Sequence, residues 1–280
     1  MISIGCTSWG DHHSLYEGVS AKDKLKVYSE HFPIVEVDAS FYAVQPKKNY
    51  EKWAEETPES FGFIVKAYQG MTGHNKEEDP YFSTEKEMFE AFVDSIEPLL
   101  HAGKLRAVLC QFPPWFDCQR PNVEKLKRCR ELLGDLPCAL ELRHQSWFDP
   151  KFREKTLAFM KEQQWIHTVC DEPQAGEGSI PIVPEATHPD RTLVRLHGRN
   201  KEGWTFKGEN WREVRCLYRY SEEELQEWAK RLQFLSRQSK HVDVAFNNNS
   251  GGDAADNAKR MIQILGIEYD GLAPTQLGFF

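Results

Sequence analysis

The sequence has no long hydrophobic run, no excess of basic charge and no pair of cysteines spaced as C-x-x-C. No segment approaches about 18 consecutive apolar residues, and the N-terminus MISIGCTSW lacks the basic and apolar regions of a secretory signal. The seven cysteines are scattered and odd in number, which argues against a disulfide framework and a structural zinc site. These absences predict a cytoplasmic protein with reduced thiols and no membrane as a partner.

The net charge of −8 has the wrong sign for holding the phosphate backbone of a long duplex. We therefore expect no extended nucleic acid as a partner, although a local basic pocket remains compatible with this charge. The sequence also lacks a G-x-S-x-G nucleophile motif, a Walker phosphate-binding loop and a dinucleotide fingerprint. The commonest nucleophile and nucleotide motifs are thereby excluded.

What the sequence does contain is a regular alternation of β-rich runs with helical patterns, which is typical of parallel βα units. The predicted strands span residues 2–6, 34–42, 61–68, 105–112, 138–145, 165–172, 192–199 and 242–249. The predicted helices span residues 22–31, 47–56, 84–101, 122–133, 150–162, 222–237 and 253–265, with Ser221 and Ser250 as N-caps. Residues 173–191 and 200–215 are expected to be irregular loops.

Eight such units predict an α/β protein, a single (β/α)₈ TIM barrel. The length of 280 residues is close to the ~250 residues typical of this fold. No repeat, low-complexity tract or linker divides the chain, so residues 1–280 are interpreted as one domain.

Polar residues alternate with apolar ones along several predicted strands, and alternate residues of a strand share one face. Glu36, Asp38 and Ser40 share one face of the second strand, opposite Val35 and Val37. The same pattern pairs Glu141 with Arg143 in the fifth strand and Arg195 with His197 in the seventh, while Lys66, Gln111 and Asp171 hold comparable late positions. Because the outer face of a barrel packs against helices, we expect these polar side chains to point inward at the mouth, where barrel enzymes keep their active sites.

Two interpretations of this polar set remain open. The residues are either internal salt bridges that fix the barrel, or the walls of a ligand pocket, since buried charges are costly unless each finds a partner. For a catalytic pocket, Glu141 or Glu36 is the candidate general base and His197 or Lys66 the candidate acid. The candidate ligand-binding residues are Arg143, His144, Arg195, Asp171, Gln111, Asn247, Asn248 and Gly251.

The turn NNNSGGDA at residues 247–254 enters the last predicted helix, where many barrels bind phosphate. Main-chain N–H groups near Gly251 and the guanidinium of Arg195 are expected to hold an anion, although a simple helix-capping turn is the alternative. No metal-binding spacing such as H-E-x-x-H occurs, so no metal or other cofactor is assigned. A divalent ion held by His144, His167 or His197 beside a carboxylate stays an open alternative.

Six aromatic residues follow predicted strand ends, where they either wall a pocket or plug the space under loops. They are Trp9, Phe41, Tyr42, Trp115, Trp147 and Trp204.

Several of these stretches together resemble the YecE-like proteins, the family called domain of unknown function 72. The matching segments include GCTSWG at 5–10, VEVDASFY at 35–42, LCQFPPWF at 109–116, ALELRHQSW at 139–147, VRLHGR at 194–199 and AFNNNSGGDAADNA at 245–258. The resemblance implies a (β/α)₈ barrel and a shared surface at the strand ends, but it implies no reaction. Asp38 stands where many relatives have asparagine, which leaves its role open.

The sequence therefore predicts an enzyme that acts on a small anionic substrate, phosphorylated or sugar-like, in the barrel mouth. The alternative is a non-catalytic protein that binds a metabolite or a nucleic-acid end in the same pocket. Fold alone does not choose between them.

Overall fold

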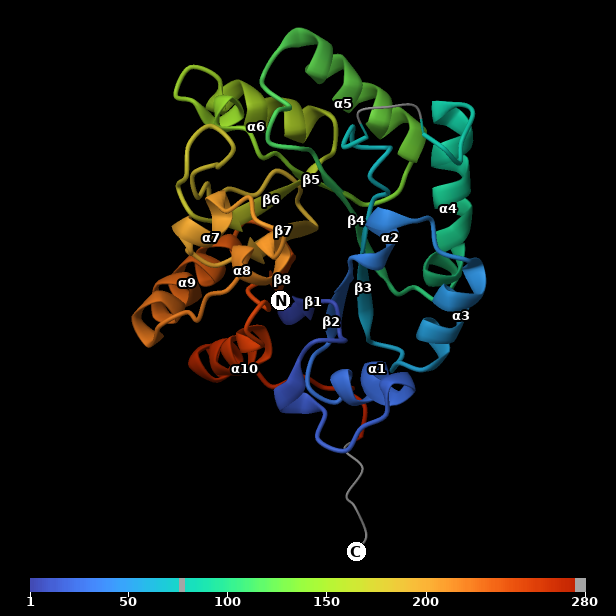
Figure 1. The fold of residues 1–280 in the computed structure, drawn as a ribbon, viewed down its shortest axis with the longest axis vertical. Helices are drawn as coiled ribbons and strands as arrows, with labels where there is room; N and C mark the ends of the chain where they lie inside the picture. The colour runs from blue at the N-terminus through green and yellow to red at the C-terminus, as the bar shows by residue number, and fades with distance from the viewer. Residues whose placement is uncertain (76–78, 275–280) are drawn as a thin grey trace, which may run out of the picture.

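Eight parallel strands close into a barrel in chain order, with β1 pairing with both β2 and β8 (Figure 1). This computed structural model describes residues 1–75 and 79–274. The strands are β1 (Ile2–Thr7), β2 (Ile34–Val37), β3 (Gly62–Lys66), β4 (Leu105–Gln111), β5 (Cys138–Glu141), β6 (Ile166–Asp171), β7 (Arg191–Leu196) and β8 (His241–Phe246). The predicted (β/α)₈ barrel is confirmed.

Helices surround the barrel, and the longer ones cover the outer faces of the strands (Figure 1). They are α1 (Lys24–Tyr28), α2 (Ala39–Tyr42), α3 (Lys47–Glu55), α4 (Glu85–His101), α5 (Arg120–Leu133), α6 (Arg153–Glu162), α7 (Lys201–Thr205), α8 (Trp211–Arg215), α9 (Glu222–Leu235) and α10 (Asp253–Leu265). Short 3₁₀ turns lie at His13–Leu15, Ala21–Asp23 and Gln145–Phe148. Among the described residues, no helix combines the length and apolar character that crossing a membrane requires.

The outer faces of the strands carry the main hydrophobic core. Val35, Val37 and Leu140 belong to this outer cluster, as the alternation predicts. A smaller apolar cluster fills the barrel itself and consists of Ile34, Ile64, Ala107, Leu109, Ala139, Ile166 and Leu193. Inside the barrel, the polar residues Glu36, Lys66 and Glu141 each lie two residues beyond a member of this cluster, on the same strand face. The barrel interior is therefore apolar in its middle and polar toward its C-terminal mouth.

Several strands end earlier than predicted. The run predicted at 34–42 pairs only as far as Val37, where the backbone of Asp38 turns into the helical region (φ −92°, ψ −20°) and α2 begins. The hydroxyl of Ser40 donates to the carbonyls of Val37 and Lys66, at 3.0 and 2.6 Å, and holds this turn against β3. The run predicted at 138–145 likewise ends at Glu141. Arg143 and His197 consequently lie on loops just beyond the strands.

The two predicted N-caps have different outcomes. Ser221 forms a capping box at the start of α9, because its side chain accepts a hydrogen bond from the N–H of Glu224 while the Glu224 carboxylate accepts one from the N–H of Ser221. Ser250 is not the cap of α10. Gly252 holds that position with φ 81°, a left-handed conformation that glycine adopts without strain.

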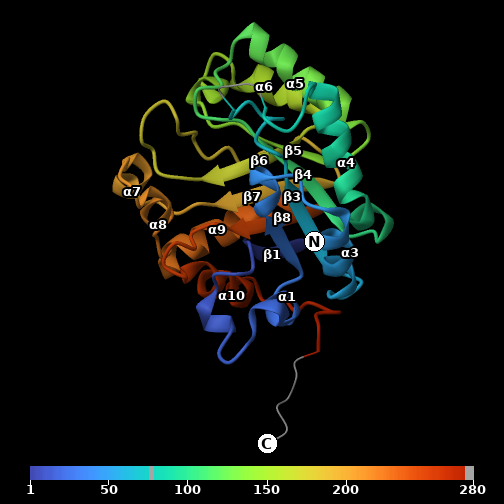
Figure 2. The same ribbon diagram turned by 45° about the vertical axis from the view of Figure 1, so that its right-hand side comes forward.

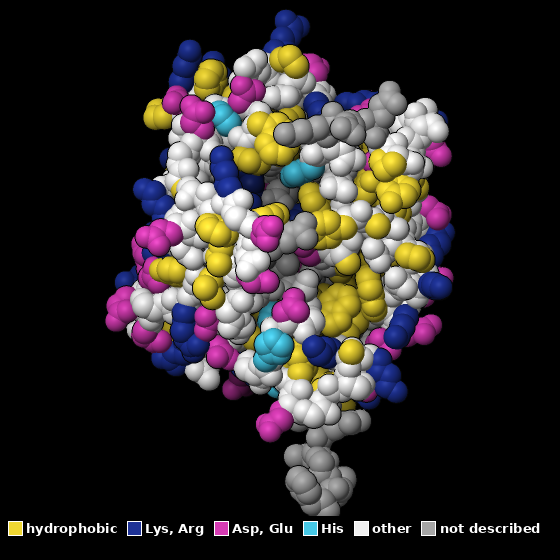
Figure 3. All heavy atoms as spheres, in the orientation of Figure 1, with side chains coloured by type: hydrophobic (Ala, Val, Ile, Leu, Met, Phe, Trp, Pro, Cys, Tyr) yellow, Lys and Arg dark blue, Asp and Glu magenta, His cyan; other side chains and the backbone are white. Residues whose placement is uncertain are grey.

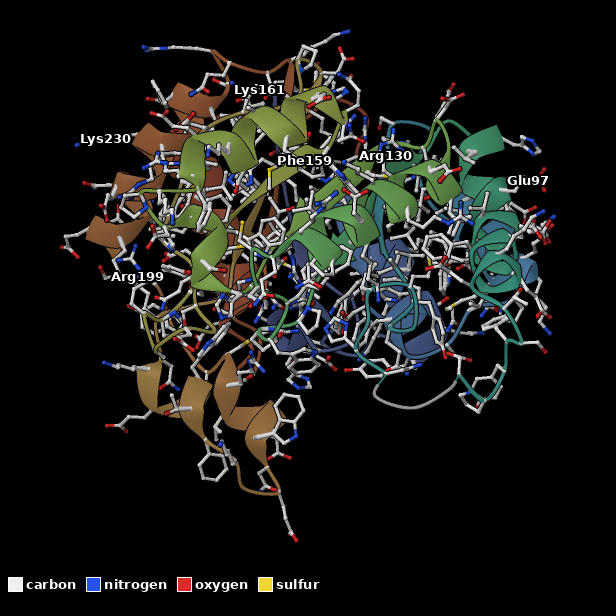
Figure 4. All side chains as sticks on the ribbon, turned by 90° about the horizontal axis from the view of Figure 1, so that it is seen from above. Glu97, Arg130, Phe159, Lys161, Arg199 and Lys230 are labelled. Carbon is white, nitrogen blue, oxygen red and sulfur yellow. The ribbon has the colours of Figure 1, made fainter. Side chains whose placement is uncertain are left out.

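The segment between β7 and α9 contains two short helices, α7 and α8, where a wholly irregular loop was expected. Asn200 caps α7 by accepting a hydrogen bond from the N–H of Gly203 at 3.0 Å. Five-residue helices are too short for a periodic pattern to reveal them. The two helices project beyond the C-terminal ends of β6 and β7 as an arm (Figure 2), and Arg199 lies at the base of this arm (Figure 4). The arm forms one side of the barrel mouth.

Candidate functional site

A fully buried arginine connects three strands at the upper end of the barrel interior. Arg195 on β7 donates from Nε and Nη2 to both carboxylate oxygens of Glu36 on β2, at 2.8 and 2.6 Å. Its remaining nitrogen, Nη1, donates to Oε2 of Glu141 on β5 at 2.6 Å. Both carboxylates are completely buried. All three nitrogens of Arg195 are thus occupied by protein carboxylates, which accounts for a buried charge that would otherwise be costly.

The second oxygen of Glu141 also has strong donors. Arg143 Nε donates to Oε1 at 2.9 Å, and the amide of Gln111 donates to the same atom at 3.0 Å. Burial by itself would raise the pKa of Glu141, but the charges of Arg195 and Arg143 hold it well below its usual range. The structure therefore favours a role for Glu141 in positioning the two arginines, since a strongly stabilised carboxylate is a weak proton acceptor.

His197 follows β7 and lies against the same cluster. Its Nδ1 is 2.8 Å from Asn247 Nδ2, and its Nε2 is 3.3 Å from Arg143 Nη2 and 3.6 Å from Glu141 Oε1. Burial and the neighbouring charges of Arg195 and Arg143 lower the pKa of His197 to about 3. A neutral imidazole is therefore present at pH 7, so His197 is not a proton donor in the imidazolium form.

Lys66 forms a separate ion pair beside this cluster. Its ammonium donates to Oδ1 of Asp38 at 2.7 Å and lies 4.3 Å from the ring centre of Phe41. Burial would raise the pKa of Asp38, but Lys66 lowers it below its usual value. The predicted inward direction of Lys66 and Asp38 is consistent with this geometry, although Asp38 lies on the turn into α2.

Above these groups the barrel opens into a cavity of about 550 Å³. The space-filling view shows this face hollowed near its centre, with hydrophobic, histidine and basic side chains around the hollow (Figure 3). The lining residues are Asp38, Phe41, Tyr42, Lys66, His74, Gln111, Pro114, Trp115, Arg143, Arg195, His197, Trp204, Trp211, Arg215, Cys216, Asn247, Asn249 and Ser250. Among the described lining residues, four Lys and Arg side chains thus accompany a single carboxylate, Asp38.

Arg215, the last residue of α8, differs from the other three cations. Its guanidinium lies 4.3 Å from the ring centre of Trp204 and 5.8 Å from that of Trp211. Among the described residues it has no carboxylate within ion-pair distance. Burial and the charge of Arg143 lower the pKa of Arg215 to about 10, so the group remains protonated at pH 7. Within the described part of the chain, the cavity therefore contains a cation without a counter-charge.

His74, like Arg215, lines the cavity but was not predicted from the sequence. Its Nδ1 lies 2.9 Å from the hydroxyl of Thr72, and within the described part of the chain Nε2 has no hydrogen-bond partner. Burial and the charges of Lys66 and Arg143 lower its pKa to about 4. The imidazole is neutral at pH 7 and able to accept a proton at Nε2. The only sequence signal for it was an isolated histidine in the loop after the third strand.

Four of the predicted ligand-binding residues do not line the cavity, because each has a local structural role. Asp171 accepts both Arg199 Nε and Trp228 Nε1, at 3.0 and 2.7 Å. His144 caps the turn at Gln145–Phe148 by accepting from the N–H of Ser146. The amide of Asn248 donates to the carbonyl of Tyr218 and to Asn257 on α10. Gly251 packs against Leu217, where a Cβ would lie 2.7 Å from a methyl carbon.

Glu36 and Glu141 also lie outside the lining, beneath the arginines that they bind. Of the predicted polar set, the residues that do reach the cavity are Asp38, Lys66, Gln111, Arg143, Arg195, His197 and Asn247. Of the six predicted aromatics, Phe41, Tyr42, Trp115 and Trp204 line it. Trp147 is instead buried and donates from Nε1 to the carbonyl of Phe116 at 2.7 Å, while Trp9 packs against Trp53.

Glu141, Cys170 and His197 offer three potential metal ligands within 4.8 Å of one another. Both oxygens of Glu141 already accept hydrogen bonds from guanidinium groups. A cation bound there would have to displace Arg195 or Arg143 from the carboxylate. His144 and His167 do not join this group, since His167 Nε2 lies 3.1 Å from the carbonyl of Val183.

Comparison with known proteins identifies relatives over the whole chain. A family model described as "Protein of unknown function DUF72" matches residues 3–277. The UPF0759 protein YunF of Bacillus subtilis is 61% identical over 283 residues, covering 100% of both chains. A DUF72 family protein of Enterococcus faecalis superposes with a TM-score of 0.93 at 40% identity, covering 99% of this chain and 100% of that one. One from Thermotoga maritima superposes with a TM-score of 0.81 at 32% identity, covering 95% and 100%.

Proposed function

The chain belongs to the DUF72 family of proteins of unknown function, and we propose that its barrel mouth binds a small anionic molecule and acts on it as an enzyme. The observation that carries this proposal is Arg215, a half-buried cation that faces the cavity and has no carboxylate partner among the residues that the structure describes. A buried charge without a counter-ion is unfavourable, and an anionic ligand would supply the missing charge.

Arg143 and Lys66 support the same anion from the cavity floor. Each uses a protein carboxylate to hold its position, which leaves further N–H groups for a ligand. Arg195 contributes its charge but no free nitrogen, because its Nε and both Nη atoms donate to Glu36 and Glu141. A phosphate or a carboxylate fits this set, since guanidinium groups bind both through paired hydrogen bonds.

In the proposed reaction, His74 and Lys66 transfer protons; both side chains contact the ring of Phe41. His74 is neutral and offers Nε2 as an acceptor, and the ammonium of Lys66 is a donor. Glu141 and Glu36 lie behind arginines and act by holding them in place. The reaction class is acid–base chemistry on a small phosphorylated or carboxylated substrate.

The alternative is a protein that binds such a ligand without changing it. It is favoured by one observation: the two most buried carboxylates of the site are both occupied by arginine donors. A binding site needs anchored cations, whereas catalysis also needs a group that exchanges protons.

A thermal-shift series with inorganic phosphate and ribose 5-phosphate tests the proposed anion site. A ligand at about 100 times its Kd adds roughly 2.7 kcal/mol, which for this chain raises the melting temperature by about 4–5 °C. Arg215→Gln should abolish the shift. The matched control is Arg237→Gln, which removes the same charge from an exposed position after the end of α9. The proposal fails if no anion shifts the wild type, or if Arg215→Gln responds like the control.

Turnover separates the enzyme from the binding protein. The bound phosphate ester is incubated with wild-type protein and with His74→Asn, and the mixture is analysed by ³¹P NMR. Product formed by the wild type and lost in a His74→Asn variant that still binds supports the enzyme. Unchanged ligand in both samples supports the non-catalytic alternative.

A further inference from the structure

The imidazole ring of His197 has almost no access to solvent. The residue is 1% exposed, and its ring centre lies 5.8 Å from that of Trp204. The backbone N–H of His197 donates to the carbonyl of Asp171 at 2.9 Å, which anchors the loop beyond β7 to β6. Because so little of the ring is exposed, its two nitrogens depend on neighbouring protein groups for their hydrogen bonds.

Each ring nitrogen of His197 faces a polar side chain. Nε2 lies 3.3 Å from Nη2 of Arg143, and Nδ1 lies 2.8 Å from the side-chain amide of Asn247. A neutral imidazole carries one N–H group and one acceptor nitrogen, so it needs one acceptor and one donor as neighbours. It cannot satisfy two donors, a guanidinium N–H and an amide NH2 group. One of the two neighbours therefore has to present an acceptor.

Arg143 cannot be that neighbour. A guanidinium group has donors only, and Nε of Arg143 is held by Oε1 of Glu141 at 2.9 Å. The same oxygen is no alternative acceptor for an N–H group at Nε2 of His197. It lies 3.6 Å away, beyond hydrogen-bond range, and it already accepts from Arg143 and Gln111. Nε2 is therefore the acceptor, and the proton of the ring lies on Nδ1.

Asn247 is able to supply the acceptor. Half a turn about its Cβ–Cγ bond exchanges Oδ1 and Nδ2, which are similar in size. In the described part of the chain the exchange breaks no other hydrogen bond, because Nδ2 has His197 as its partner and Oδ1 has none. The backbone stays in place, with the N–H of Asn247 donating to the carbonyl of Leu196 at 2.8 Å. Oδ1 then accepts from the N–H group at Nδ1 of His197.

We propose that Asn247 is a ligand-binding residue of the mouth, oriented by Arg143 through His197 so that its amide NH2 group donates to an unprotonated oxygen of the bound ligand. Asn247 lines the cavity, and the NH2 end of its amide is the end that remains for a ligand. This inference rests on the proposed anion site and adds to it a neutral donor whose direction the protein sets. A ligand group that only donates, such as an ammonium, is rejected at this position.

The first test is the position of the ring proton of His197 in the protein without ligand. Long-range ¹H–¹⁵N correlation NMR distinguishes the two neutral forms of a histidine ring, and His197→Gln identifies the signals of this residue. Since the pKa of His197 is lowered to about 3, the ring is neutral at pH 7. The proton should lie on Nδ1. A proton on Nε2 would overturn the inference and leave the anion site standing.

The second test is the binding of ribose 5-phosphate to Asn247→Asp, measured by isothermal titration calorimetry. A carboxylate accepts from Nδ1 of His197 as the amide oxygen does, but it places a negatively charged oxygen where the NH2 group would meet the ligand. Losing a hydrogen bond to a charged group weakens binding about tenfold or more, so the affinity should fall by at least about tenfold.

Asn210→Asp is the matched control, because Asn210 is an exposed residue at the start of α8 and does not line the cavity. It adds the same charge to the arm and should bind ribose 5-phosphate like the wild type. Equal affinities of Asn247→Asp and Asn210→Asp would overturn the role of Asn247 and leave the anion site standing. If the wild type binds neither ribose 5-phosphate nor inorganic phosphate, the anion site and the ligand contact of Asn247 both fall.

Discussion

Replacing Arg195 with methionine should destabilise the protein strongly. The substitution keeps a long side chain but leaves Glu36 and Glu141 buried with one guanidinium fewer between them. Breaking a buried ion pair by removing one partner costs about 3–5 kcal/mol. The entropy of unfolding is about 2.1 cal/mol/K per residue, or roughly 0.6 kcal/mol/K for 280 residues. We therefore expect the melting temperature to fall by about 5–8 °C.

The loss of stability in Arg195→Met should also depend on pH. In the wild type the pKa of Glu141 is held well below its usual value, so its stabilising contribution is present above the unfolded pKa of 4.5 and is lost as the pH falls through the folded pKa. Without Arg195, burial raises the pKa of Glu141, and its protonation relieves the unpaired charge. The difference between wild type and variant should be largest near about pH 8 and shrink toward about pH 5.

Differential scanning calorimetry at these two pH values measures both effects. Arg237→Met, at an exposed position, controls for the loss of one charge. Glu36→Gln combined with Arg195→Met should recover part of the stability, because it removes one of the two stranded carboxylates. A fall of less than about 2 °C at both pH values would refute the argument that Arg195 neutralises this cluster.

Three further substitutions have defined outcomes. Burial raises the pKa of Glu172 to about 7, so the stability that this residue contributes is complete below its unfolded pKa of 4.5 and is lost as the pH rises through 7. Glu172→Gln should therefore raise the melting temperature by a few degrees more at about pH 8 than at about pH 5. Ser221→Ala removes the capping box of α9 and should cost about 1 kcal/mol in urea unfolding. Gly198→Ala should lower the urea midpoint, because Gly198 has φ 84° and an added Cβ would lie 2.5 Å from Cβ of Tyr218. A midpoint equal to that of the wild type would contradict this prediction.

Period-two alternation was sufficient to predict the faces of the strands but not their ends. Val35 and Val37 pack outward and Glu36 points inward, as the pattern requires. The same residues give no sign that pairing stops at Val37, because Ser40, Phe41 and Tyr42 are compatible with a strand. The turn depends on hydrogen bonds from Ser40 to two carbonyls, one of them on β3, and such a tertiary contact is not encoded in local periodicity.

The candidate site was predictable where a charge lies on a strand and less so where it lies on a loop. Arg195 and Lys66 follow directly from alternation, whereas Arg215 lies on a five-residue helix that sequence periodicity does not reveal. Asn247 and Asn248 show a different limit of prediction from the sequence. They are neighbours of the same type, yet Asn247 lines the cavity and Asn248 holds α10 in place through Asn257. Sequence alone does not distinguish an amide that faces a ligand from one that joins two segments.

The sequence separation within the Arg195 cluster has a consequence for biosynthesis. Glu36 and Glu141 precede Arg195 by 159 and 54 residues, so a ribosome completes both acidic strands before it makes the base that neutralises them. Until β7 emerges, a nascent chain that closed its first six strands would enclose two carboxylates without their main cation, which is unfavourable. We expect the nascent barrel to remain hydrated and accessible to chaperones until the seventh strand has left the exit tunnel, and to close only then.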